Sequence, residues 1–400
     1  MPFTAATIAA ESAPAFQQLD IEMSTISPTG RTSADRLSVS MVRGSVMLLV
    51  FLSSGCKSSG LIQLPLLDAA VLEVEAPVSR IAFGSCARPT RDQSIYDTIR
   101  DRQPDVFLFI GDNVYAPNNL DPSLAGLRKQ YRLLGKSEPF ARLRAEVPLL
   151  ITWDDHDYGP NDAGGEFAYK AESQRIFNQV WGIGPDDPRS RREGVYHTQT
   201  VGPAGQRVQF ILLDTRYFRT PLNANPAGSA LRYAPQADPD ANMLGEAQWR
   251  WLADTLHEPA DLRILATSIQ VIADGHGFEA WHLMPAQRER LYEVIHDSGA
   301  ENVILISGDR HSAAIYRRDD AIDYPLYEVT SSSLNVPLTR FLAKVDHEPG
   351  PHRLHDPVYA ANFGEMEIDW SEARVRLTIR SDQGNVLREE VVALGDLQRP

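Results

Sequence analysis

Short, nearly continuous apolar runs alternate with amphipathic stretches through most of this 400-residue chain. Apolar runs separated by helical patterns are typical of strands that helices bury on both faces. We expect buried strands at residues 80–85, 105–110, 148–153, 207–213, 262–267 and 302–307. We expect helices at residues 93–102, 172–181, 246–256 and 285–296. The alternation therefore predicts an α/β fold in which helices cover sheets.

The C-terminal part of the chain follows a different pattern. Apolar and polar residues alternate there, which is typical of antiparallel strands. These strands are expected at residues 326–331, 365–370, 374–379 and 388–394. Four connecting segments are long and rich in Pro, Gly, Asn and Asp, and loops of that kind commonly build binding sites. They are residues 116–123, 157–165, 223–241 and 339–357.

Composition excludes several classes of protein. The formal net charge is −14, so electrostatic attraction to nucleic acid phosphates is unfavourable and we expect no stable nucleic-acid binding. Bound metal ions would still allow an acidic protein to act on phosphate substrates, because they reverse the local field. Two cysteines are too few for a disulfide-rich scaffold or a zinc site of four cysteines.

The N-terminal residues have the features of an export signal. Residues 1–40 are polar and predict a disordered segment or an over-long start, with translation beginning at Met41. Residues 41–56 combine a positive charge, a short apolar core and small residues before Cys56, and resemble a bacterial lipoprotein signal. We expect an exported protein, either anchored to a membrane by a lipid on Cys56 or periplasmic or extracellular. Residues 57–77 are interpreted as a linker and 78–400 as the main domain.

Clusters of polar residues follow four of the predicted strands. They are Gly84-Ser85-Cys86, Gly111-Asp112-Asn113-Val114-Tyr115, Trp153-Asp154-Asp155-His156-Asp157 and Ser307-Gly308-Asp309-Arg310-His311. In open α/β sheets, ligands bind beyond the carboxyl ends of the strands. The adjacent carboxylates Asp154 and Asp155 would repel each other unless cations lay nearby. The clusters therefore predict one metal-binding site.

The four motifs, in this order, resemble the alkaline phosphatase D (PhoD-like) family of the calcineurin-type metallophosphoesterases. Residues 213–219 and 281–288 add to the resemblance, which covers about residues 79–333. It implies a four-layer α/β/β/α sandwich with extra antiparallel strands at the C-terminus. It also implies metal-dependent hydrolysis of phosphate esters, either phosphodiesters or phosphomonoesters, by a metal-activated water at a dinuclear site.

The resemblance also implies which residues bind the metals. The first metal would be held by Cys86, Asp112, Tyr115 and His311. Asp112 would bridge to a second metal held by Asp155 and Asp309. A thiolate with a phenolate favours Fe(III), and a set of oxygens suits Ca²⁺, although Mg²⁺, Mn²⁺ or Zn²⁺ would also fit. Either Gln270 or His276 could supply a further ligand, and the sequence does not decide between them.

Roles in catalysis follow from the same motifs. His156 would protonate the leaving alkoxide and would be steered by Asp157. Asn113 would orient the water or a phosphate oxygen, and Arg88 and Arg310 would bind the phosphate. The alternative is a catalytically inactive binding lipoprotein that retains the fold. It is disfavoured because every type of metal ligand is present.

Two residues near the motifs have a structural interpretation. Asp154 is expected to cap its loop while its neighbour Asp155 binds metal. Arg216 belongs to the motif at residues 213–219, and it is interpreted equally well as the buried ion-pair partner of Asp214.

Overall fold

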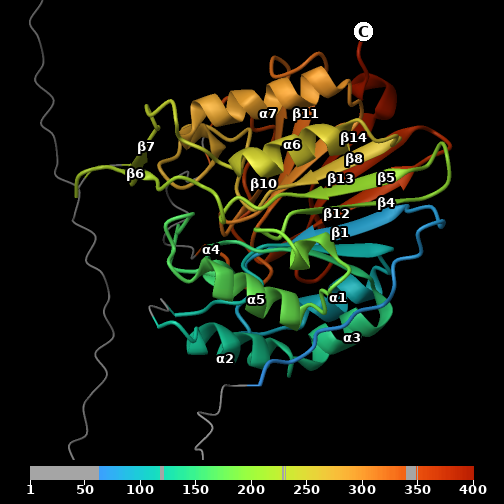
Figure 1. The fold of residues 1–400 in the computed structure, drawn as a ribbon. Helices are drawn as coiled ribbons and strands as arrows, with labels where there is room; N and C mark the ends of the chain where they lie inside the picture. Colours follow the sequence, from blue (N-terminus) through green and yellow to red (C-terminus); the bar gives the residue numbers. More distant parts are fainter. Residues whose placement is uncertain (1–62, 118–120, 228, 230, 339–347, 349) are drawn as a thin grey trace, which may run out of the picture. The chain divides into compact units, whose positions relative to one another are not determined.

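Two six-stranded sheets pack against each other, and helices cover their outer faces (Figure 1). This computed structural model describes residues 63–117, 121–227, 229, 231–338, 348 and 350–400. The predicted α/β/β/α architecture is confirmed. No helix within the described ranges is both long enough and apolar enough to cross a membrane.

The first sheet joins the N-terminal strands to the C-terminal ones. Its order is β14 (Val386–Ala393), β13 (Arg374–Ser381), β12 (Asn362–Asp369), β1 (Arg80–Gly84), β2 (Val106–Ile110) and β3 (Leu149–Thr152). Strands β1, β2 and β3 are parallel, whereas β12, β13 and β14 pair antiparallel. The predicted extra antiparallel strands therefore extend this sheet.

The second sheet has a parallel centre and antiparallel edges. Its order is β10 (Ala313–Arg318), β11 (Leu326–Ser331), β9 (Val303–Ser307), β8 (Leu262–Ala266), β5 (Val208–Leu212) and β4 (His197–Val201). The four central strands are parallel, and β10 and β4 pair antiparallel at the edges. Strands β4 and β10 were not predicted, because neither forms an isolated apolar run.

Helices form the two outer layers, seen below and above the sheets in Figure 1. The first sheet is covered by α1 (Ile95–Asp101), α2 (Ala125–Leu134), α3 (Glu138–Glu146) and α5 (Lys170–Val180). The second is covered by α6 (Gly245–Leu256) and α7 (Pro285–Ser298). Shorter elements among the described residues are α4 (Asp155–Tyr158), the hairpin of β6 (Asn223–Ala224) and β7 (Tyr233–Ala234), and the 3₁₀ turns Pro188–Ser190, Trp281–Leu283 and Leu394–Leu397.

Strand β2 shows why an uninterrupted apolar run suits this position. Leu108 and Ile110 face the core between the two sheets, whereas Phe107 and Phe109 face the helices. Alternate side chains of a strand point to opposite faces, so both faces of β2 need apolar residues. Each such buried side chain stabilises the fold by about 1.5–3 kcal/mol. The strand is thereby fixed, and so is the polar cluster that follows it.

The described part of the predicted linker, residues 63–77, packs against the main domain. Leu64 and Leu67 are buried in the core beneath the helices, and the Leu67 N–H donates to the Val180 carbonyl (2.7 Å). This segment is therefore part of the folded domain and not a free linker. The predicted disordered segment 1–40 and the predicted signal with Cys56 lie outside the described residues.

Candidate metal centre

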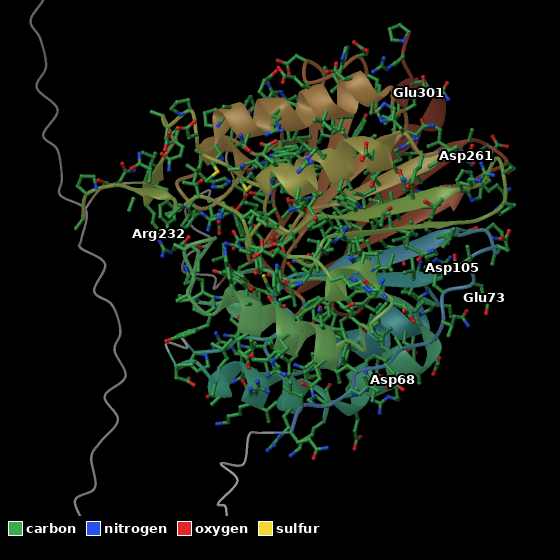
Figure 2. All side chains as sticks on the ribbon, viewed as in Figure 1. Asp68, Glu73, Asp105, Arg232, Asp261 and Glu301 are labelled. Atoms are coloured by element: carbon green, nitrogen blue, oxygen red, sulfur yellow. The ribbon has the colours of Figure 1, made fainter. Side chains whose placement is uncertain are left out.

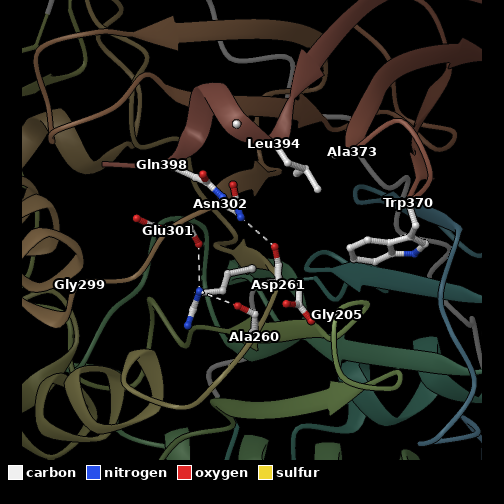
Figure 3. A pocket seen from close by; sticks show the side chains of 12 residues that line it. Gly205, Ala260, Asp261, Gly299, Glu301, Asn302, Trp370, Ala373, Leu394 and Gln398 are labelled. Carbon is white, nitrogen blue, oxygen red and sulfur yellow. Dashed lines mark hydrogen bonds between the residues drawn. The ribbon is translucent and has the colours of Figure 1, made fainter. Parts of the chain in front are cut away.

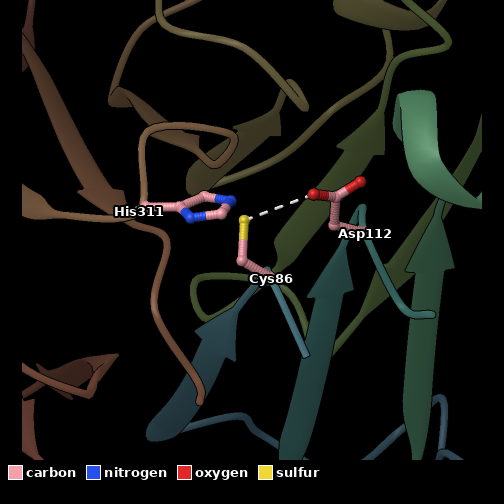
Figure 4. Close-up of side chains that lie close together, drawn as sticks. All are labelled: Cys86, Asp112 and His311. Atoms are coloured by element: carbon pink, nitrogen blue, oxygen red, sulfur yellow. Dashed lines mark hydrogen bonds between the residues drawn. The ribbon is translucent and has the colours of Figure 1, made fainter. Parts of the chain in front are cut away.

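Four strand ends meet at one edge of the two sheets. Strand β1 leads to Cys86, β2 to Asp112, β3 to Asp155 and β9 to His311. Ligand atoms of Cys86, Asp112 and His311 lie within 4.8 Å of one another (Figure 4), and so do those of Asp112, Asp155 and His156. Asp112 belongs to both groups. The strand ends therefore converge as predicted. The metal-binding roles of Cys86, Asp112, Asp155 and His311 stay predictions, and His156 was predicted as a general acid rather than as a ligand.

The backbone of this edge adopts an unusual conformation. Four predicted ligands have positive φ, namely Cys86 (59°), Asp112 (50°), Asp309 (68°) and His311 (54°). Non-glycine residues rarely adopt this left-handed conformation, and those that do cluster at functional sites. Gly111 (φ 108°) must be glycine, because a Cβ there would lie 2.6 Å from the Asp154 Cβ. Each strand thus turns sharply and presents its polar side chain at the sheet edge.

The first group combines a thiol, a carboxylate and an imidazole, and the predicted ligand Tyr115 places a phenol beside them. Cys86 Sγ lies 3.5 Å from Asp112 Oδ2, and Tyr115 Oη lies 2.8 Å from His311 Nε2. Burial raises the pKa of the Cys86 thiol and of the Tyr115 phenol. Burial lowers the pKa of His311 to about 4, so its imidazole is neutral and able to bind metal. A bound cation would reverse the effect on the thiol, since coordinated thiols are deprotonated.

The second group is rich in buried carboxylates. Burial, and then the charges of Asp155, Asp154 and Asp157, raise the pKa of Asp112. Asp155 Oδ2 accepts the Asp162 N–H (2.7 Å), whereas its buried Oδ1 has no partner among the described residues. A buried carboxylate oxygen without a partner is costly, and a cation would compensate it. The donor set therefore fits metal ions.

A buried ion-pair network supports the loop that carries Asp155. Arg216 Nε donates to Asp154 Oδ1 and its Nη1 to Glu279 Oε2, both at 2.6 Å. Arg219 also pairs with Glu279 (3.0 Å). Asp154 therefore has the structural role predicted for it. The predicted Arg216–Asp214 ion pair is wrong, because Asp214 accepts backbone N–H groups instead.

Two predicted catalytic residues have a different role. Asp157 is fully buried and accepts the Asp154 N–H through Oδ1 and the Asn113 backbone and side-chain N–H groups through Oδ2. Its oxygens are thus engaged away from the His156 ring, so the prediction that Asp157 steers His156 is corrected. Asn113 is also fully buried and donates to the Thr152 carbonyl (2.8 Å). It braces Asp157 rather than orienting a substrate or water.

The predicted general acid and the two predicted phosphate-binding residues lie around the candidate metal ligands. His156 is half-buried, and its ring centre lies 4.4 Å from that of Tyr115. The Arg88 guanidinium lies over the same tyrosine ring (4.8 Å). Arg310 is buried and forms an ion pair with Glu348. The charge of Arg310 is thus already offset, whereas Arg88 is the better placed of the two to meet a phosphate.

Three candidate ligands are not part of the two groups. Asp309 is half-buried, and burial followed by the charges of Asp154 and Asp155 raises its pKa. Its carboxylate is close enough to be affected by the charges of Asp154 and Asp155, but it is not among the ligand atoms of the second group, which lie within 4.8 Å of one another. Gln270 Oε1 and His276 Nε2 lie 3.1 Å apart, so the two alternatives for a further ligand bind each other.

Some residues that shape the centre were not predicted. Ser332 Oγ accepts the His311 N–H (2.7 Å) and lies 3.4 Å from Cys86 Sγ. Its place directly after the predicted strand 326–331 could have indicated it. Asp162 lies in the predicted site-building loop 157–165. Glu279 has no distinguishing sequence signal.

A separate cavity of about 560 Å³ lies at the opposite ends of the strands (Figure 3). Asp261 and Asn302 line it, and they come just before β8 and β9 rather than after them. The Asn302 side chain donates to the Asp261 carbonyl (2.9 Å), and Trp370 forms another wall. Ligands of α/β sheets bind at the carboxyl ends of strands, so the place where the carboxyl ends of β1, β2, β3 and β9 meet remains the candidate site.

Comparison with known proteins decides the family. Residues 81–379 match the family model of the PhoD-like phosphatases. This chain belongs to that family. The PhoD-like chain is 24% identical over 281 residues to alkaline phosphatase D of Bacillus subtilis (strain 168), covering 59% of this chain and 46% of that protein. It thus spans about half the length of this curated relative.

Solved structures share the fold of this PhoD-like chain. A structure described as that of PhoD matches with a TM-score of 0.62 and 17% identity, over 81% of this chain and 70% of the other. GAP50, described as the anchor in the inner membrane complex of Plasmodium, matches with a TM-score of 0.51 and 13% identity, over 79% and 89%. At these identities the likeness concerns the fold alone.

Proposed function

We propose that this PhoD-like chain hydrolyses phosphate esters at a centre of two metal ions. The observation that carries the proposal is the convergence of the candidate ligands Cys86, Asp112 and His311, and of Asp112 and Asp155 beside His156, so that one carboxylate is shared. Membership of the PhoD-like phosphatase family supports the same activity. Fold alone would not, because one fold hosts many functions.

The ligand types favour a different ion in each group. The thiol of Cys86 and the phenol of Tyr115 suit Fe(III), whereas the carboxylates around Asp155 suit a hard ion such as Ca²⁺. Mg²⁺, Mn²⁺ and Zn²⁺ are the alternatives. When bound, such ions would neutralise the phosphate oxygens and make a nearby water more acidic. Asp309 would assist by adding negative charge near the second group.

Two half-buried side chains beside the candidate ligands supply the remaining chemistry. His156 donates a proton to the leaving alkoxide, and the Tyr115 ring beneath it fixes its orientation. Arg88 binds a phosphate oxygen, and its position over the same ring places it beside the first group. Both residues are half-buried, so a substrate could reach them.

The charge balance favours phosphodiesters over phosphomonoesters. Glu348 offsets the charge of Arg310, so Arg310 contributes little net positive charge to the candidate site. A diester carries one negative charge and needs less compensation than a monoester, which carries close to two. The proposed substrate is therefore a small phosphodiester.

The cellular location is proposed from the sequence. Residues 41–56 have the order of parts of an export signal, which supports export with a lipid on Cys56 or release as a periplasmic or extracellular protein. Mass spectrometry of the native N-terminus tests this proposal. An unmodified chain that begins at residue 1 would refute it.

Hydrolysis assays test the activity directly. Protein supplied with Fe³⁺ and Ca²⁺, or with Mn²⁺, should hydrolyse bis(p-nitrophenyl) phosphate faster than p-nitrophenyl phosphate. His156→Ala should lower kcat by about 10²–10⁴-fold, the usual contribution of a general acid. The control is His257→Ala, which removes an exposed imidazole at the end of α6.

The alternative is a binding protein without activity. One observation supports this alternative: GAP50, which shares the fold, is described as an anchor. Lack of turnover with every metal tested, in protein that contains no bound metal, would favour that alternative and refute the proposed enzyme.

A further inference from the structure

We propose that Asp162 is a positioning residue through which the β6–β7 hairpin holds the Asp155 carboxylate for metal binding. This inference rests on the proposed function, because it concerns the second ligand group. Asp162 lies in the loop after α4, and the hairpin lies between β5 and α6 in the chain. The structure joins these two distant segments through a short series of hydrogen bonds.

The backbone of Asp162 contacts the candidate ligand directly. Its N–H donates to Asp155 Oδ2 at 2.7 Å. This bond occupies one carboxylate oxygen and leaves the buried Oδ1 without a partner among the described residues. Asp162 has φ 56°, a left-handed conformation that needs support from its surroundings. The orientation of Asp155 therefore depends on how firmly Asp162 is held.

The side chain and the carbonyl of Asp162 supply that support. Tyr233 Oη donates to Asp162 Oδ2 at 2.5 Å, and Arg232 Nη2 pairs with the same oxygen at 3.0 Å. Arg219 Nη2 donates to the Asp162 carbonyl at 2.5 Å, and Arg219 is itself paired with Glu279. Asp162 is thus fixed on two sides, by the hairpin and by the buried ion-pair network.

The hairpin is well placed for this role. Tyr233 is 9% exposed, and its N–H donates to the Gly277 carbonyl (3.1 Å), which ties β7 to the body of the protein. Arg232 is half exposed and lies on the side of the molecule where β6 and β7 project (Figure 2). The series Arg232 and Tyr233 to Asp162 to Asp155 therefore runs from the surface to the metal centre.

Groups that form hydrogen bonds to metal-binding side chains, and so orient them, commonly contribute 10–100-fold to metal affinity. Loss of the contacts to Asp162 should weaken the second metal by about that factor. It should leave the first metal unchanged, since Cys86 and His311 are oriented by Ser332 instead. A purely structural role would lower stability without this selective effect.

The experiment compares metal binding by the full chain and its variants. Tyr233→Phe removes the 2.5 Å bond with little change in shape, and Tyr233→Phe combined with Arg232→Gln removes both hairpin contacts. The control is Asn225→Ala in the same hairpin, whose side chain binds the Leu231 carbonyl. Metal-free protein is titrated with Mn²⁺ and followed by electron paramagnetic resonance, with thermal unfolding measured without metal.

The expected result is a 10–100-fold weaker second Mn²⁺ equivalent in the double variant, an intermediate loss in Tyr233→Phe, and wild-type affinity in the Asn225→Ala control. Unchanged affinity in the double variant would overturn the inference. Equal loss of both equivalents together with a lower melting temperature would also overturn it. Wild-type protein that binds no Mn²⁺, Ca²⁺ or Fe³⁺ would instead refute the proposed function.

Discussion

Asp112→Asn removes one negative charge from the centre of the candidate metal site and preserves the size of the side chain. Asn tolerates the left-handed backbone of this position (φ 50°) at least as well as Asp does. Its amide oxygen can still accept the His156 N–H, which now donates to Asp112 Oδ1 at 3.1 Å. The variant therefore tests charge and metal binding with little change in packing.

The structure gives the size of the expected effect without metal. Oxygens of Asp112 and Asp155 lie within 4.8 Å, where two unit charges repel by about 3.5 kcal/mol at an effective dielectric constant near 20. The raised pKa of Asp112, due to burial and then to its acidic neighbours, means that protonation already relieves part of this repulsion. Metal-free Asp112→Asn should therefore be more stable than wild type, by at most about 3.5 kcal/mol.

Bound metal should reverse the order of stability, so that wild type becomes more stable than Asp112→Asn. Wild type at a free metal concentration of 100 times its Kd gains about 2.7 kcal/mol. A variant that binds 100-fold more weakly gains only about 0.4 kcal/mol at the same concentration. The assay is urea unfolding at neutral pH, with EDTA and with Mn²⁺. The control is Asp254→Asn, an exposed position on α6 with the same change in charge.

One result would refute this reasoning. If Asp112→Asn is less stable than wild type in EDTA and keeps the full gain from metal, Asp112 acts as a structural hydrogen-bond acceptor and not as a shared ligand. The Asp254→Asn control shows how much of any shift comes from net charge alone.

Three further predictions concern the surroundings of the centre. Cys86→Ser should lose the first metal and keep the second by elemental analysis, and retention of both would contradict the thiol's role. Arg88→Ala should raise the KM for bis(p-nitrophenyl) phosphate about 10–100-fold, as loss of a charged hydrogen bond predicts, with steady-state kinetics as the measure. Arg216→Met should destabilise the protein by about 3–5 kcal/mol in urea unfolding, because Asp154 would stay buried without its cationic partner and Glu279 would keep only Arg219. A loss below 1 kcal/mol would contradict that.

The fold could be predicted largely from local pattern. The buried strands of both sheets, such as β2 and β9, are continuous apolar runs because both of their faces are covered. Helices α2 and α3 were not predicted, because Pro139 and the polar residues around them obscure the apolar spacing. The edge strand β4 was also not predicted, since its residues are mostly half-buried.

The candidate site could be predicted in composition but not in detail. Cys86, Asp112 and His311 follow strands directly, so sheet topology alone brings them together. Hydrogen-bond partners depend on which loops approach, and this is why Asp157 was assigned to His156 when it holds the Asn113 backbone instead. The contact between Asp162 and Tyr233 joins residues 71 positions apart, which no local pattern indicates.

The most direct test of a shared-carboxylate metal centre is anomalous X-ray diffraction from crystals of the purified protein, recorded at the absorption edges of the metals it contains. We predict two anomalous peaks, one within bonding distance of Cys86 Sγ and His311 and one beside Asp155, with Asp112 contacting both. Crystals of active protein with no peak at these residues, or with metal bound only elsewhere, would contradict the account.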